Sequence, residues 1–183
     1  MLRMYFVKVS VVFIIIFIVN TALADVFFIP KKSNAYRIPE YAHILIAGEI
    51  TSGDVGRLRN IIKKRLNELN SQITEQPIVL LDSPGGDVSA ALEMGRLLRN
   101  ILAFTVVDGG ASCNSACVFL LAGGVSRNLY LDGRIGLHRP RFDYGQFANL
   151  TKDQAASTYE KLKSECSTYM KEMGISDQVF YDM

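Results

Sequence analysis

The sequence has 183 residues, 49% of them hydrophobic, and a formal net charge of +2. This length suits a single domain with an ordinary hydrophobic core. The 20 basic residues nearly balance the 18 acidic ones, so charge gives no reason to expect a nucleic-acid partner or binding to an anionic membrane surface.

The first 24 residues are predicted to be a secretory signal peptide. Arg3 and Lys8 precede an apolar run over residues 9–19, and small residues follow at the positions of an A-x-A cleavage site. The run is short for a membrane span, which needs about 20 residues. We therefore expect one exported domain, residues 25–183, in the periplasm or outside the cell. An uncleaved anchor over residues 5–24 is the alternative and would tether the protein to a membrane.

The three cysteines are Cys113, Cys117 and Cys166, an odd number that is too small for a disulfide scaffold. With only two histidines in the chain, no zinc site is predicted, and no other cofactor is implied. Cys113 and Cys117 could form a disulfide. The preferred interpretation is that they pack as small buried residues around Ser115.

The hydrophobic pattern predicts strands that alternate with amphipathic helices. Short apolar runs indicate buried strands, and apolar residues three or four positions apart indicate helices. The predicted strands are 42–50, 77–81, 104–107, 128–131 and 134–137, and the predicted helices are 52–70, 88–102, one beginning at or next to Ser115, 151–173, and a last stretch over 176–181. This order favours an α/β fold of βαβ units with a parallel sheet. Residues 25–40 are expected to form an extended entry segment, and Asp132-Gly133 a tight turn between the last two strands.

The stretch GGASCNSACVFLLAGG, residues 109–124, carries one hydroxyl, Ser115, between two cysteines. At the start of a buried helix, free N–H groups and the helix dipole would favour an oxyanion. A serine needs a base to take its proton, and His138 at the end of a predicted strand suits that role near neutral pH. His43 lies inside a predicted strand and is expected to be a packed or edge histidine.

A second glycine turn, Gly85-Gly86, also follows a predicted strand. Strand ends in a parallel sheet share one edge, where ligands bind. The amides of Ala116 and of Gly85 or Gly86 are therefore candidate donors to an oxyanion.

Three motifs resemble the Clp protease proteolytic subunit (ClpP) and its secreted relatives in sequence, order and spacing: Asp82-Ser83-Pro84-Gly85-Gly86, the segment 115–123, and Arg134-Ile135-Gly136-Leu137-His138-Arg139-Pro140. The resemblance covers residues 44–183. It implies the ClpP/crotonase fold of stacked βαβ units, with a protruding handle helix matching 151–173. By position it makes Ser115 the nucleophile, His138 the general base, and Gly85 and Ala116 the oxyanion-hole amides.

The third member of the triad is less well placed by this resemblance. Asp182 falls within one residue of the family's aspartate, and the chain ends one residue later, without the family's final segment. Two interpretations stay open for Asp182, a triad carboxylate and a solvated residue. An incomplete C-terminus and a complete chain are likewise both left open.

The function predicted is a serine peptidase acting on peptides or unfolded protein segments. An exported protein has no obvious ATP supply, so no ATP-driven unfoldase is expected as partner. A homo-oligomer is expected, and two interpretations stay open for the long helix 151–173: packing on a neighbouring subunit and covering its own domain. Two alternatives are a non-catalytic scaffold of the same fold and a crotonase-type acyl-CoA enzyme.

Overall fold

The computed structural model describes residues 25–28, 43–68, 76–138, 150–176 and 178. The predicted signal peptide, Asp182 and most of the predicted helical stretch 176–181 lie outside these residues. Among the described residues, no helix has the length and apolar character that a membrane crossing requires.

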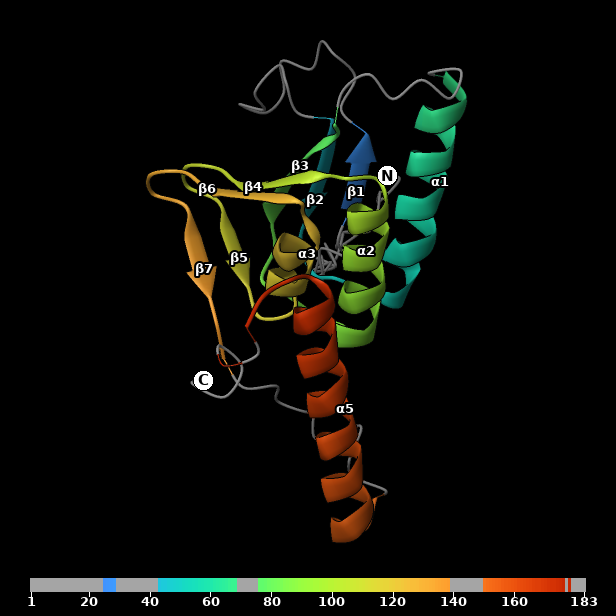
Figure 1. The fold of residues 1–183 in the computed structure, drawn as a ribbon, viewed down its shortest axis with the longest axis vertical. Helices are drawn as coiled ribbons and strands as arrows, with labels where there is room; N and C mark the ends of the chain where they lie inside the picture. The colour runs from blue at the N-terminus through green and yellow to red at the C-terminus, as the bar shows by residue number, and fades with distance from the viewer. Residues whose placement is uncertain (1–24, 29–42, 69–75, 139–149, 177, 179–183) are drawn as a thin grey trace, which may run out of the picture.

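A five-stranded sheet and a small two-stranded sheet organise the chain (Figure 1). The elements are β1 (Asp25–Phe28), β2 (Ile44–Ala47), α1 (Ser52–Glu68), β3 (Ile78–Asp82), α2 (Val88–Asn100), β4 (Phe104–Val107), β5 (Ser112–Asn114), α3 (Cys117–Gly123), β6 (Ser126–Leu129), β7 (Arg134–Gly136) and α5 (Lys152–Glu172). The large sheet has the order β1-β2-β3-β4-β6, in which only β1 is antiparallel. The predicted α/β fold with parallel βαβ units is confirmed.

The structure adds details that the sequence analysis did not predict. The extended entry segment contributes a strand, β1, and the short polar strand β5 has too little hydrophobic pattern to be predicted. The last two strands do not pair as neighbours across the turn at Asp132-Gly133, because β6 joins β4 in the large sheet and β7 joins β5 in the small one. Asp132 does adopt a left-handed turn conformation, with φ 71°.

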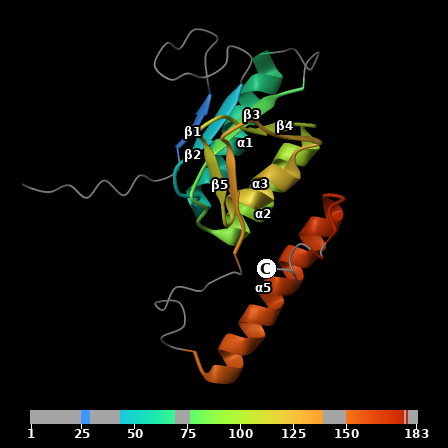
Figure 2. The same ribbon diagram turned by 90° about the vertical axis from the view of Figure 1, so that its left-hand side faces the viewer.

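The main core lies between the large sheet and helices α1, α2 and α3, which cover one face of it (Figure 2). Alternate residues of β2 and β3 point into this core, and α3 is buried along its whole length. Helices α2 and α3 approach closely at Gly95 and Gly123, since a Cβ on Gly123 would collide with the backbone of Gly95. Helix α3, which follows Ser115, is therefore packed in the core of the domain.

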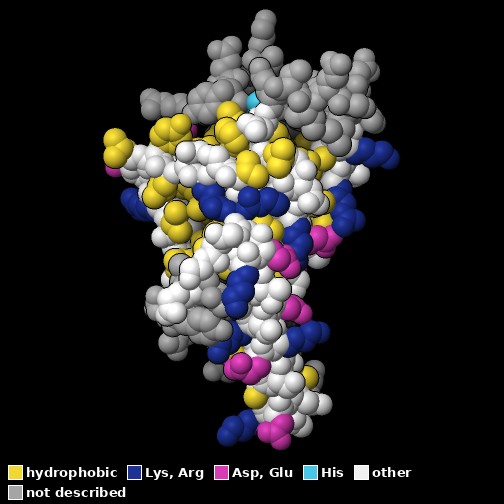
Figure 3. Space-filling model, in the orientation of Figure 1, with side chains coloured by type: hydrophobic (Ala, Val, Ile, Leu, Met, Phe, Trp, Pro, Cys, Tyr) yellow, Lys and Arg dark blue, Asp and Glu magenta, His cyan; other side chains and the backbone are white. Residues whose placement is uncertain are grey.

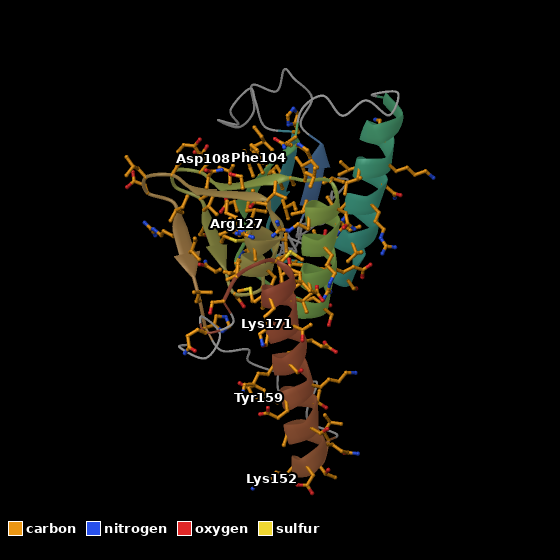
Figure 4. The ribbon with its side chains drawn as sticks, viewed as in Figure 1. Phe104, Asp108, Arg127, Lys152, Tyr159 and Lys171 are labelled. Carbon is orange, nitrogen blue, oxygen red and sulfur yellow. A yellow bond between two sulfur atoms is a disulfide. The ribbon has the colours of Figure 1, made fainter. Side chains whose placement is uncertain are left out.

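Helix α5 extends well past the domain, with Lys152 at its far end and Lys171 near the domain (Figures 1 and 4). Thr151 caps its start, because its hydroxyl accepts a hydrogen bond from the Gln154 N–H. Polar and charged side chains cover much of the protruding part (Figure 3). Its buried residues lie in the last two turns, so only this end is packed on the domain. The predicted handle helix is thus present with nearly the predicted bounds.

Two arginines fix the end of α5. Arg99 Nη2 and Arg127 Nη2 donate hydrogen bonds to the Met173 carbonyl at 2.9 and 2.7 Å, and both side chains also bond the Ala122 carbonyl at the end of α3. Burial, together with the charge of Arg99, lowers the pKa of Arg127. The carbonyl groups at the ends of α3 and α5 thus offset the electrostatic repulsion between the two neighbouring guanidinium groups.

Tyr169 anchors the same end of α5 in the core. Its hydroxyl donates a 2.6 Å hydrogen bond to the Phe119 carbonyl, and the two rings meet edge to face with centroids 5.7 Å apart. Burial raises the pKa of Tyr169 above its usual value. The hydroxyl lies directly over Gly95, at the position that a Cβ there would occupy.

Candidate functional site

Three segments of the chain run side by side at one edge of the molecule. Past the end of β3, Ser83 pairs with β5: its N–H donates to the Ser112 carbonyl at 2.7 Å, and its carbonyl accepts from the Asn114 N–H at 2.9 Å. On the other side of β5, the Ser115 N–H donates to the Gly136 carbonyl of β7 at 2.8 Å. The three motifs therefore meet as parallel neighbours, with their carboxyl ends together.

Ser115 occupies a sharp bend between β5 and α3. Its φ of 53° is left-handed, a region that side chains with a Cβ enter at a cost of about 1–3 kcal/mol. The predicted helix begins two residues later, at Cys117, so Ser115 belongs to the turn before the helix. Ser115 is partly exposed, so solvent can reach its side chain although its backbone is held in the bend.

Gly85 lies directly against this bend. Its φ is 104°, and a Cβ there would be 2.7 Å from Ser115 Cβ and 3.0 Å from the Ala116 nitrogen. Only glycine permits both the conformation and the approach. The glycine turn after β3 is thus in contact with the Ser115-Ala116 peptide. This agrees with the prediction that the two turns lie at the same edge of the sheet.

The three candidate oxyanion amides differ in their hydrogen bonds. The Gly85 N–H donates to Ser83 Oγ at 3.1 Å, and that hydroxyl donates in turn to the Gly48 carbonyl at 2.6 Å. Within the described part of the chain, the N–H groups of Gly86 and Ala116 donate no hydrogen bond. Among the described residues, Gly86 and Ala116 are therefore the two candidate amides whose N–H groups are left for a new acceptor.

His138 lies two residues beyond β7, at the same end of the strand pair as Ser115. Asn114 is the register partner of Gly136, so Ser115 directly follows the end of β5 and His138 follows the end of β7 by two residues. The histidine is exposed. The strand pairing thus places Ser115 and His138 just past the same ends of two neighbouring strands, and their roles as nucleophile and base stay a prediction.

The other histidine has a different position. His43 immediately precedes β2 at the opposite, amino end of the parallel strands, and its Nδ1 accepts a 3.1 Å hydrogen bond from the Ile78 N–H. It is half-buried and hydrogen-bonded at the end of a strand inside the sheet, which fits the first of the two predicted alternatives, a packed histidine. Asp182 is outside the described residues, so its predicted role stays a prediction.

The preferred interpretation of the first two cysteines is wrong. Cys113 and Cys117 are both fully buried, as predicted, but they form a disulfide with Cα atoms 5.2 Å apart, on either side of Ser115. The odd cysteine, Cys166, is free and fully buried on α5, and burial raises its pKa to about 12. The i, i+4 spacing of the two cysteines across a turn is the signal in the sequence that indicates the bridge.

The structure adds Ser83 and Asp82 to the residues that build the site. The Ser83 side chain braces the glycine turn, and the Asp82 carboxylate accepts a 3.0 Å hydrogen bond from the Ser112 N–H. A serine two residues before glycine indicates a side-chain-capped turn, whereas the Asp82 contact depends on the unpredicted strand β5. No group of three metal-ligating side chains occurs among the described residues.

Comparison with known proteins identifies a family for this arrangement. The Clp protease family model matches residues 32–179, a span that contains all three motifs. Among solved structures, a point mutant of the 1510-N membrane-bound stomatin-specific protease is similar with 21% sequence identity and a TM-score of 0.48, over 73% of this chain and 68% of the other. No curated protein matches the sequence. By the family match, the chain belongs to the Clp protease family.

Proposed function

We propose that this protein is a serine peptidase in which Ser115 attacks the carbonyl of a peptide bond. The observation that supports the proposal is the contact between the Gly85-Gly86 turn and the Ser115-Ala116 bend, next to the strand β7 that His138 follows. Membership in the Clp protease family supports peptide hydrolysis at the level of the reaction class.

In the proposed mechanism, His138 takes the proton of the Ser115 hydroxyl as its oxygen bonds to the substrate carbonyl carbon. The carbonyl oxygen becomes negatively charged and accepts hydrogen bonds from the Gly86 and Ala116 N–H groups, which have no other acceptor within the described residues. His138 then returns the proton to the leaving amine, and water releases the acyl group. Gly85 allows the two turns to meet, while its own N–H holds the turn through Ser83.

Peptides and unfolded segments are the proposed substrates, as for ClpP-like proteases generally, which typically form oligomers. The N-terminal 24 residues carry the features of an export signal. We therefore place the activity in the periplasm or outside the cell, without an ATP-driven partner. Asp182 is the proposed carboxylate that orients His138.

A fluorophosphonate probe tests the proposal, because it phosphonylates only serines that a base activates. The full-length protein should be labelled, and Ser115→Ala should abolish the label. Ser112→Ala is the matched control, since Ser112 lies three residues away on β5 and should leave labelling unchanged. His138→Ala should slow labelling at least 100-fold, in line with the loss of general-base catalysis.

Hydrolysis of fluorescent unfolded casein should follow the same pattern across the four proteins. Absence of labelling and of hydrolysis in the folded wild-type protein would refute the peptidase proposal and favour the non-catalytic scaffold. Labelling that survives in Ser115→Ala would show that another serine is the nucleophile.

A further inference from the structure

We infer that the Cys113–Cys117 disulfide is a positioning device for Ser115, and that full activity requires the oxidised form of the protein. This inference rests on the proposed function of Ser115. The disulfide closes a ring of five residues with Ser115 at its centre, and it joins the strand that ends before the serine to the helix that begins after it. Both cysteines are fully buried, so the two ends of the ring are fixed in the core.

The conformation of Ser115 supplies the reason for such a device. A non-glycine residue holds a left-handed φ only where its surroundings enforce it. Three described backbone hydrogen bonds involve the bend: the Ser115 N–H donates to the Gly136 carbonyl at 2.8 Å, and the Val118 and Phe119 N–H groups donate to the Ser115 and Ala116 carbonyls at 3.1 Å. None of the three joins β5 to α3 directly, whereas the disulfide joins Cys113 of β5 to Cys117 of α3.

The same constraint acts on the proposed oxyanion hole. The Ala116 N–H belongs to the peptide that joins Ser115 to Ala116, so the direction of this donor follows the backbone angles on both sides of that peptide. A bend that relaxed would therefore turn the hydroxyl and the amide away together. We expect catalysis to be more sensitive to the disulfide than substrate binding is, because both groups act on the transition state.

Stabilisation of the whole fold is the simpler role for a disulfide. Cross-linking stabilises a protein mainly in proportion to the logarithm of the loop that it closes, and a five-residue ring is close to the smallest loop possible. The disulfide should therefore contribute little to the stability of the whole fold. Its location around the proposed nucleophile favours a role in positioning Ser115.

The test compares the oxidised wild-type protein with the double variant C113A/C117A and with Cys166→Ala. Cys166 is the matched control, because it is equally buried but lies on α5 and forms no disulfide. In casein-peptide hydrolysis, the double variant should have a kcat at least about tenfold lower than that of the wild type. Tenfold is near the lower end of the loss expected when Ser115 becomes free to leave its left-handed conformation. KM should change less than twofold, and Cys166→Ala should keep the kcat of the wild type.

Wild-type protein produced and kept under a phosphine provides a second comparison without any substitution. Reduction transfers two electrons, with two protons from water, to the disulfide, which gives two thiols, while the phosphine becomes its oxide. Alkylation and mass spectrometry should find three modified cysteines in this form and one in the oxidised form. The reduced protein should show the same loss of kcat as the double variant and recover it on reoxidation.

Hydrogen exchange over residues 109–124 separates this inference from the proposed function. Faster exchange in the reduced form at Ser115 and Ala116, with unchanged exchange in α2, would support the positioning role even if the oxidised protein proved inactive. Equal kcat in the oxidised and reduced forms, or equal exchange at the bend when no activity is detected, would overturn the inference.

Discussion

Gly95→Ala tests the close packing that joins α5 to the domain. Gly95 lies in the interior of α2, where alanine would normally stabilise a helix by about 1 kcal/mol. Here the new methyl group would coincide with the Tyr169 hydroxyl and lie 2.8 Å from the Phe119 carbonyl oxygen. The ring would have to move, which breaks its hydrogen bond to Phe119 at a cost of about 1 kcal/mol.

Overpacking of this kind costs about 1–3 kcal/mol more. After the gain in helix propensity is subtracted, we expect a net loss of about 2 kcal/mol in the free energy of unfolding. For a chain of this size, each kcal/mol corresponds to about 2–4 °C, so the Tm should fall by about 4–8 °C. Thermal unfolding followed by circular dichroism measures the change.

Gly56→Ala is the matched control, because Gly56 lies in helix α1 and a Cβ there would meet no atom within 4 Å. It should raise the Tm by about 2–4 °C through helix propensity alone. The double variant G95A/Y169F should be more stable than the sum of its two single effects predicts, since removing the hydroxyl makes room for the methyl group. A Tm for Gly95→Ala equal to or above that of the wild type would refute the packing explanation.

Two further variants examine the same end of α5. Arg127→Met keeps most of the side-chain volume but removes the hydrogen bonds to the Ala122 and Met173 carbonyls at the ends of α3 and α5. The free energy of unfolding, measured by urea titration, should fall by about 2 kcal/mol. No change would show that Arg99 alone is sufficient to hold these two helix ends. Burial raises the pKa of Cys166 from 9.0 to about 12, so the folded state keeps a proton that the unfolded state loses, and stability that is present below pH 9 should decline as the pH rises toward 12. Cys166→Ala should show a shallower decline over that range, and identical pH profiles would contradict the assignment.

The large elements could be predicted from the sequence because each carries its own pattern. The core strands have continuous apolar runs, and α2 repeats its apolar residues at helical spacing, so local sequence and burial agree. Strand β4 was predicted with the bounds that the structure has. Helix α5 was predicted from a long stripe, although only its last two turns are buried.

The pairing of the short strands could not be predicted in the same way. Ser112–Asn114 contains two polar residues and one cysteine, and it becomes a strand only because Ser83 and β7 lie on either side of it. The turn at Asp132-Gly133 looks like a hairpin locally, yet the flanking strands enter different sheets. Partners distant in the sequence decide these features, and a window of local sequence does not contain them.

The candidate site was predictable in its components and less so in its fine geometry. Ser115, His138 and the glycine turns could be chosen because nucleophile, base and amide donors each require a particular residue type. Which glycine amide is available depends on where the Ser83 hydroxyl points, and a single sequence carries no such information. The disulfide is hard to predict from the sequence because its two cysteines would also suit simple burial as small residues.

Strand β7 has a consequence for the thermal behaviour of the protein. It has three residues, none of them fully buried, and within the described part of the chain it pairs with β5 alone. Such a strand can detach while the large sheet and its helices stay folded. Detachment of β7 would move His138 away from Ser115. Warming should therefore abolish the proposed peptidase activity reversibly, at temperatures where the helical circular dichroism signal is unchanged.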